Sequence, residues 1–171
     1  MSRKLNNVIV AVDGSEESMN ALKWALDNLK LQSSPSDGSL YILHIQSPPS
    51  IFAGVSPAAI PFGGPSDLEV PAFTAAIEAH QNRITQAILD HALQICADKN
   101  VQVNTKVVIG DPKQKICEAV EELHADLLVM GSRAFGPIRR MFLGGVSNYC
   151  SNHAECPVMI VKDAMIVKDA S

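Results

Sequence analysis

The stretch Asp126–Val161, DLLVMGSRAFGPIRRMFLGGVSNYCSNHAECPVMIV, indicates how the chain folds. It opens with an uninterrupted apolar run, Leu127–Met130, of the kind found in strands covered on both faces. Gly131 ends the run, and the loop after it holds three more glycines and three arginines, with no Asp or Glu before Glu155. Glycines let backbone N–H groups converge on an anion, and the start of a following helix adds partial positive charge. The stretch therefore predicts a strand, a basic loop suited to phosphate and a helix, although glycines needed only for turns are an alternative.

Strand and helix patterns alternate through the rest of the chain. Apolar, mostly β-branched runs predict further strands at 7–12, 40–45, 101–109 and 158–161. Helical periodicity starts near residue 15, fills 72–99 and begins again at Asp111-Pro112, which are typical of an N-cap and a first helical position. The residues expected on the buried side of the long helix are Ile77, Ile84, Ile88, Leu93 and Ile95. The residues expected to share one face of the third strand are Val101, Val103, Thr105 and Val107.

The order of these elements, β-α-β-α-β-α-β-α-β, predicts an α/β fold with a five-stranded, doubly wound parallel sheet. In the flavodoxin-like (Rossmann-like) strand order 3-2-1-4-5, the connections leave for opposite faces between the first and fourth strands, and ligands bind at that point. The carboxyl ends of these two strands are Val12-Asp13 and Met130-Gly131. Because the glycine-rich loop starts there, composition and topology indicate one site, and we expect a nucleotide in it.

The turn after the first strand is a poor candidate for phosphate binding. Its helix starts with Glu16 and Glu17, whose charges suit a helix N-terminus but would repel a phosphate. No GxGxxG fingerprint occurs at this turn, which argues against a dinucleotide dehydrogenase.

Composition restricts the class of protein. The chain has 171 residues, of which 47% are hydrophobic and 5% aromatic, and we expect one domain over 1–171. The net charge of −4 argues against general nucleic-acid binding. The polar start MSRKLNN and the short VIVAV behind it do not resemble a signal peptide or a membrane span. Four scattered cysteines do not form a disulfide framework, so we expect a reduced cytoplasmic or nuclear protein without a membrane partner.

Two segments lie outside the regular pattern. Residues 47–71 are rich in proline and glycine and almost uncharged, so we expect a surface insertion loop, either a lid or an insertion without a role. The sequence MIVKDA at 159–164 is repeated at 165–170, so the tail 163–171 offers a second register for strand pairing.

Four motifs resemble the universal stress protein family, in its single-domain plant type with a long insertion after the second strand. They are IVAVDGSEES at 9–18, VIGDPKQKI at 108–116, ADLLVMGSR at 125–133 and CPVMIVK at 156–162, and the resemblance covers about residues 5 to 162. The ATP-binding branch of the family carries Gly-x2-Gly-x9-Gly-Ser/Thr. In this chain Gly131 and Gly144 match that pattern, whereas Ala134 replaces its second glycine and Gly145 its hydroxyl residue.

The two departures predict weakened binding of ATP or AMP. If position 134 needs a left-handed backbone, Ala134 costs about 1–2 kcal/mol. Losing a hydroxyl that bonds a charged phosphate costs about 1.5–3 kcal/mol, so the two together weaken affinity about 100-fold or more. Arg133, with Arg139 or Arg140, offers compensating charge, and Ser147 offers a nearby hydroxyl.

The resemblance also implies roles for individual residues. Ala11, Val12 and Ile45 would frame the adenine, with backbone polar groups reading its edge. Asp13 would face the ribose or a Mg²⁺ ion, the alternative being a carboxylate that bonds turn amides. Met130 and Gly131 would floor the ribose. The residues that would wrap the phosphates are Gly144, Gly145, Val146 and Ser147, and the expected nucleotide-binding set also includes Arg133 and Ala134.

The resemblance further implies a homodimer formed through the last strand, at about 157–162. We expect a stress-response protein that acts as an adenine-nucleotide-dependent switch or chaperone-like factor. A nucleotide-free dimerisation module and a slow ATP hydrolase are the alternatives, and no residue pattern identifies a base for hydrolysis. The spacing Cys150-x2-His153-x2-Cys156 is better explained by packing than by zinc, because a helix turns its third member away from the first two.

Overall fold

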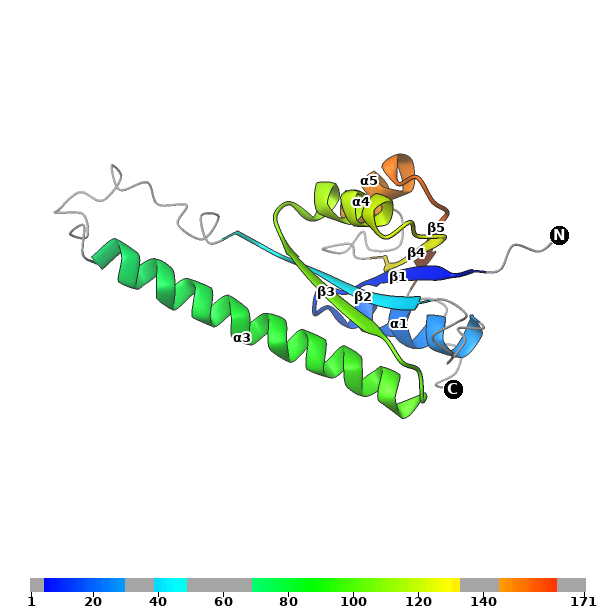
Figure 1. Cartoon of the computed structure of the whole chain (residues 1–171), viewed down its shortest axis with the longest axis horizontal. Coiled ribbons are helices and arrows are strands. Elements are labelled where there is room, and N and C mark those ends of the chain that lie inside the picture. The colour runs from blue at the N-terminus through cyan, green and yellow to red at the C-terminus, as the bar shows by residue number, and fades with distance from the viewer. Residues whose placement is uncertain (1–4, 30–38, 49–68, 133–144, 163–171) are drawn as a thin grey trace.

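The structure is a computed structural model that describes residues 5–29, 39–48, 69–132 and 145–162. One parallel sheet runs in the order β3-β2-β1-β4-β5, which confirms the predicted doubly wound fold (Figure 1). Its strands are β1 (Asn7–Ala11), β2 (Ser39–Gln46), β3 (Asn104–Ile109), β4 (Leu127–Gly131) and β5 (Val158–Val161). The helices are α1 (Glu16–Asn28), α3 (Glu69–Asp98), α4 (Pro112–Glu122) and α5 (Gly145–His153).

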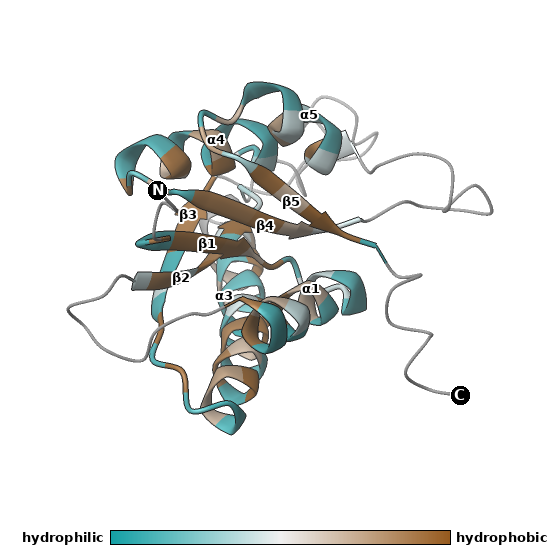
Figure 2. Ribbon diagram, turned by 90° about the vertical axis from the view of Figure 1, so that its right-hand side faces the viewer, coloured by the Kyte–Doolittle hydropathy of each residue, from teal (hydrophilic) through white to brown (hydrophobic). Residues whose placement is uncertain are grey.

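Two apolar layers cover the sheet, one on each face. Figure 2 shows α1 and α3 on one side of the strands and α4 and α5 on the other. Along β1, Val8 and Val10 pack toward α1 and α3, whereas Ile9 packs toward α4 and α5. All three side chains are buried, which explains why the strand reads as a continuous apolar run.

Side-chain caps fix the starts of the helices that follow β1 and β3. The Ser15 hydroxyl accepts a hydrogen bond from the Ser18 N–H at 3.2 Å, at the start of α1. The Asp111 carboxylate accepts from the Lys113 N–H at 3.0 Å, and Pro112 is the first residue of α4. The helix start predicted at Asp111-Pro112 is therefore confirmed.

The long helix α3 differs from the prediction at its start. It begins at Glu69 rather than 72, so Pro71 lies in its first turn instead of in the preceding loop. A proline is tolerated there because the first N–H groups of a helix have no partner within the helix. The rest of the insertion, 49–68, and the tail 163–171 lie outside the described residues.

The buried side of α3 was predicted only in part, since Ile88 is partly buried against the core but two of the other residues are exposed. Ile84 is 47% exposed and Leu93 is 37% exposed, whereas Ile95 is buried as expected. A helix of 30 residues is about 45 Å long and the eight residues of β2 span about 26 Å, so the sheet cannot cover all of it. Figure 1 shows α3 extending beyond the strands. The residues that are buried are Gln81, Thr85, Leu89, Ala92, Ile95 and Cys96.

The strand β3 is shorter than predicted. Val101 and Val103 pack against the core before the strand begins at Asn104. Thr105 and Val107 are exposed, so only Val101 and Val103 of the four residues reach the core. β3 is an edge strand of the sheet, which leaves this part of it open to solvent.

Candidate functional site

The switch point of the sheet lies between β1 and β4. β1 pairs in parallel with β2 on one side and with β4 on the other. The chain leaves β1 for α1 on one face and reaches α5, on the opposite face, after β4 (Figure 1). The carboxyl ends of these two strands therefore border the crevice in which doubly wound proteins bind ligands.

Apolar residues from three strands and one helix meet on the α4 and α5 side of this crevice. Met130 is buried in the core beneath those helices. Ala11, Ile45 and Val146 are half-buried and pack against the same core cluster. The structure thus brings together four of the residues expected at the site. Their arrangement provides an apolar wall beside the start of α5.

Val12 does not share the apolar face of Ala11. It is buried in the core on the α1 and α3 side, opposite Ala11. Its N–H donates to the Leu43 carbonyl at 2.9 Å, and Nδ1 of the buried His44 lies 2.9 Å from its carbonyl oxygen. Its N–H therefore has a protein partner already, and only a second lone pair of its carbonyl remains to read a base edge.

Asp13 is built into the turn that starts α1. Its Oδ1 accepts hydrogen bonds from the Ser15 N–H, at 2.9 Å, and from the Ser15 hydroxyl. Its own N–H donates to the Ser18 hydroxyl at 3.2 Å. These bonds favour the turn-forming alternative for this carboxylate. The described part of the chain contains no group of three His, Cys, Asp or Glu able to hold a metal.

Gly131 is required by packing against α1. A β-carbon at this position would lie 2.6 Å from the backbone oxygen of Glu17 and 2.7 Å from its carbonyl carbon. No side chain fits in that space, because both neighbours are backbone atoms. The first glycine of the loop motif therefore allows β4 to approach the first turn of α1, whatever it contributes to a ligand.

Ser147 joins the start of α5 to the end of β4. Its side chain is 3% exposed, and its hydroxyl donates to the Gly131 carbonyl at 2.9 Å. The hydroxyl proton is therefore not available to a phosphate. Gly145, Val146 and Ser147 form the first turn of α5, and the backbone N–H groups of such a turn have no acceptor within the helix.

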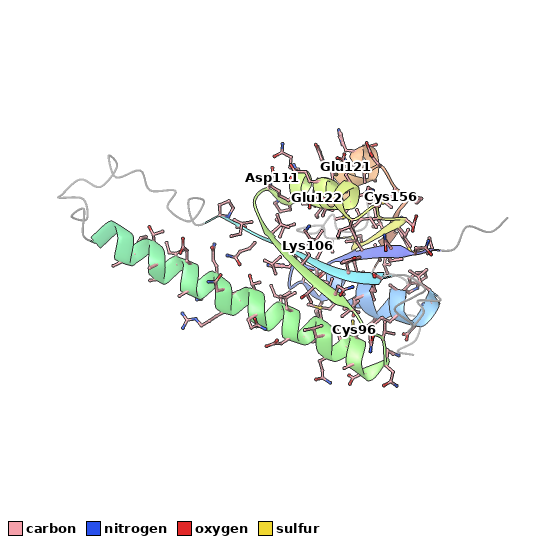
Figure 3. All side chains as sticks on the ribbon, in the orientation of Figure 1. Cys96, Lys106, Asp111, Glu121, Glu122 and Cys156 are labelled. Carbon is pink, nitrogen blue, oxygen red and sulfur yellow. The ribbon has the colours of Figure 1, made fainter. Side chains whose placement is uncertain are left out.

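Lys113 is a residue near the site that sequence reasoning missed. A β-carbon on Gly145 would lie 3.8 Å from Lys113 Cε and 3.9 Å from its Nζ. Thirty-two positions separate the two residues, so no local pattern connects them. The available signal was topological. α4 follows β3 and α5 follows β4, so both helices begin at the carboxyl ends of parallel strands, and both lie on the same face of the sheet (Figure 2). Figure 3 marks the start of α4 at Asp111.

Part of the expected site lies outside the described residues. This applies to Arg133, Ala134 and Gly144, and also to Arg139 and Arg140. Their proposed contributions remain predictions.

The cysteines do not form a second site. Cys150 is fully buried between α5 and the sheet beside Cys117, and burial raises its pKa to about 12. His153 is exposed and stacks on Tyr149 with a ring separation of 4.0 Å. Cys156 and Cys96 belong to opposite layers of the core (Figure 3). These positions agree with packing roles for Cys96 and Cys150.

The strand order defines a doubly wound α/β protein, a class in which ligands bind at the switch point. A sequence model of the universal stress protein family matches residues 4–162, and the chain belongs to that family. A relative from Arabidopsis thaliana, universal stress protein A-like protein, is 28% identical over an alignment of 173 positions, gaps included. The alignment covers 95% of this chain and 93% of the relative.

Solved structures show the same fold. The hypothetical protein MJ0577 superposes with a TM-score of 0.71 at 19% identity, covering 94% of this chain and 97% of the other. A universal stress protein family protein from Arabidopsis thaliana, solved with AMP bound, gives a TM-score of 0.59 at 27% identity over 92% of this chain and 91% of that one. None of the described helices is long and apolar enough to cross a membrane.

Proposed function

We propose that this chain binds an adenine nucleotide, ATP or AMP, at the switch point between β1 and β4. The observation that carries the proposal is the apolar wall of Ala11, Ile45, Met130 and Val146 beside the first turn of α5. An adenine ring needs apolar surface, and a phosphate needs converging N–H groups, so this arrangement suits both ends of the ligand. The plant relative with AMP bound supports the same ligand class.

The proposed site extends across both strand ends. Asp13 stands at the ribose side in this proposal, and Mg²⁺ would depend on phosphate oxygens for most of its coordination. The full proposed set is Ala11, Val12, Asp13, Ile45, Met130, Gly131, Arg133, Ala134, Gly144, Gly145, Val146 and Ser147.

The biological role in this proposal is that of a cytoplasmic stress-response factor, working as a homodimeric nucleotide-dependent switch or chaperone-like protein. The membership of the chain in the universal stress protein family supports this role. The position of β5 at the end of the strand order, among the described residues, supports the dimer, because an edge strand can pair with a second copy of itself.

Hydrogen–deuterium exchange with and without saturating ATP locates the site. The first-turn amides at 145–147 have no partner within α5, so they exchange fast unless a phosphate accepts from them. We expect ATP to slow exchange there and at 11–13, and adenosine to slow it only at 11–13. Protection confined to other elements, or none at all, would overturn the proposed site.

A nucleotide-free dimerisation module is the second candidate function. The bond from the Ser147 hydroxyl to Gly131 and the absence of a hydroxyl at Gly145 favour it, because both remove donors that a phosphate would use. The two candidates differ in the exchange experiment: the module shows no nucleotide-dependent protection at any concentration.

A further inference from the structure

The side chain of Lys113 extends from the start of α4 toward the start of α5. It is exposed, and its Nζ lies 3.9 Å from the position of a β-carbon on Gly145. The described ion pairs engage Lys99, Lys106 and Lys115 with carboxylates, whereas none of the described residues forms one with Lys113. The Lys113 ammonium is thus available to another anion.

The Lys113 ammonium lies beside the N-terminus of α5, where a positive charge is unfavourable. The N-terminus of a helix carries partial positive charge, so acidic groups are favoured there and cations are not. The first turn of α1 follows that rule with Glu16 and Glu17, but the first turn of α5 contains no acidic residue. A phosphate between the ammonium and the first N–H groups of α5 would turn this unfavourable pairing into two favourable ones.

A side chain at position 145 would extend toward Lys113. Among the described residues, the atoms nearest to a β-carbon at Gly145 belong to the Lys113 side chain, at ordinary contact distance. Position 145 is also where the ATP-binding pattern of the family carries Ser or Thr. The lost hydroxyl and the nearby ammonium are therefore at the same point of the site.

We propose that Lys113 is a phosphate-binding residue of the nucleotide site, and that its ammonium replaces the hydroxyl missing at Gly145. This inference rests on the proposed nucleotide function and names the group that makes the site selective for ligands with a phosphate. It predicts a ligand with at least one phosphate, because adenosine alone gives Lys113 nothing to bind.

The test compares Lys113→Gln with Lys115→Gln in calorimetric titrations of nucleotide-stripped protein with ATP and with adenosine. Both substitutions remove one positive charge from the same helix, but Lys115 Nζ is held 2.8 Å from Glu118 Oε2. We expect Lys113→Gln to weaken ATP binding about tenfold, the loss for one charge-assisted hydrogen bond, and to leave adenosine affinity unchanged. Lys115→Gln should change neither affinity.

Three results would overturn the inference. If wild-type protein binds ATP and Lys113→Gln binds it equally well, Lys113 is not a ligand and the proposed function stands. If Lys113→Gln loses ATP and adenosine affinity by the same factor, the residue supports the site structurally and does not read phosphate. If wild-type protein binds neither compound, the proposed function fails and this inference fails with it.

Discussion

Gly131 has a structural reason to be glycine that does not depend on a ligand. A β-carbon added at this position would lie 2.6 Å from the Glu17 backbone oxygen, which is too close for two non-bonded atoms. At Gly145, by contrast, the nearest atom of the described residues to such a carbon is Lys113 Cε, at 3.8 Å. Two glycines of one motif therefore serve different purposes, and substitution by alanine separates them.

We expect Gly131→Ala to lower the free energy of unfolding by about 2–3 kcal/mol, because backbone atoms must move apart. Gly145→Ala is the matched control and should cost no more than about 0.5 kcal/mol, since the methyl group meets the Lys113 side chain only at ordinary contact distance, 3.8 Å from Cε. Urea unfolding monitored by circular dichroism measures both. Equal midpoints for Gly131→Ala and the wild type would contradict the packing argument.

The two most buried thiols predict a pH dependence of stability. Burial raises the pKa of Cys96 to about 11 and that of Cys150 to about 12, from an ordinary value of 9.0. Well below pH 9 both thiols are protonated in the folded and unfolded states. Between pH 9 and 11 the unfolded chain releases these protons and the folded chain retains them, so stability falls as the pH rises.

The stability advantage of the wild type over Cys150→Ala should therefore shrink from pH 8 to pH 10.5. Urea unfolding of both proteins at several pH values measures it, and each protein must be compared with itself at pH 8 because other groups titrate as well. Parallel pH profiles for the two proteins would show that the Cys150 thiol ionises equally easily in both states.

Among the elements, α3 shows where apolar periodicity fails as a guide. The strands and most helix starts were predictable because continuous apolar runs and caps are local signals. The buried side of α3 was predictable only in part, because Gln81 and Thr85 occupy some of it. On β2, the side chains that point toward α3 are apolar at Leu40 and Ile42 but polar at His44 and Gln46, and all four are buried. A prediction that looks only for isoleucines and leucines does not detect a contact between polar residues.

The hydrogen bond between Thr85 and Gln46 attaches α3 to β2 through this polar contact. Thr85 Oγ1 donates to Gln46 Oε1 at 2.8 Å, and both side chains are buried. Thr85→Val keeps the shape but leaves a buried amide oxygen without this donor, so we expect a loss of about 1–3 kcal/mol in the free energy of unfolding. Thr105→Val, on exposed β3, should stay within about 0.5 kcal/mol of wild type. Thermal or urea unfolding that ranks the two variants the other way would refute this prediction.

The site was predictable to the extent that topology determines it. Strand order alone places Met130 and Gly131 at the switch point, and the structure confirms their location. The approach of Lys113 to Gly145 and the bond from Ser147 to Gly131 depend on how separate helices pack, so local sequence does not reveal them. Val12 faces away from Ala11 because neighbouring residues of a strand alternate, a rule that was available from sequence.

For the molecule as a whole, the edge of β5 is the proposed dimer contact. The Leu128 N–H donates to the Pro157 carbonyl at 3.0 Å, and the Ser132 N–H donates to the Val161 carbonyl at 3.1 Å. Alternate residues of β5 therefore bond to β4, which leaves Ile160 with its N–H toward the open edge. A second copy would use that N–H in strand pairing.

Ile160→Pro removes this N–H without affecting the bonds to β4, and an edge strand tolerates proline at such a position. We expect it to convert the dimer to a monomer that keeps its helical circular dichroism signal, whereas Ile160→Ala remains dimeric. Size-exclusion chromatography with light scattering gives the mass of each. A dimeric Ile160→Pro variant would place the interface elsewhere, and a monomeric wild type would contradict the dimer.

Calorimetric titration of nucleotide-stripped wild-type protein with magnesium-ATP tests the central claim, with GTP and AMP as comparisons. The apolar wall at the switch point and the positive groups at the start of α5 predict binding of ATP with a dissociation constant in the roughly micromolar range, and at least tenfold weaker binding of GTP. No heat and no thermal stabilisation at millimolar ATP would contradict the account and leave the dimerisation module as the function of this chain.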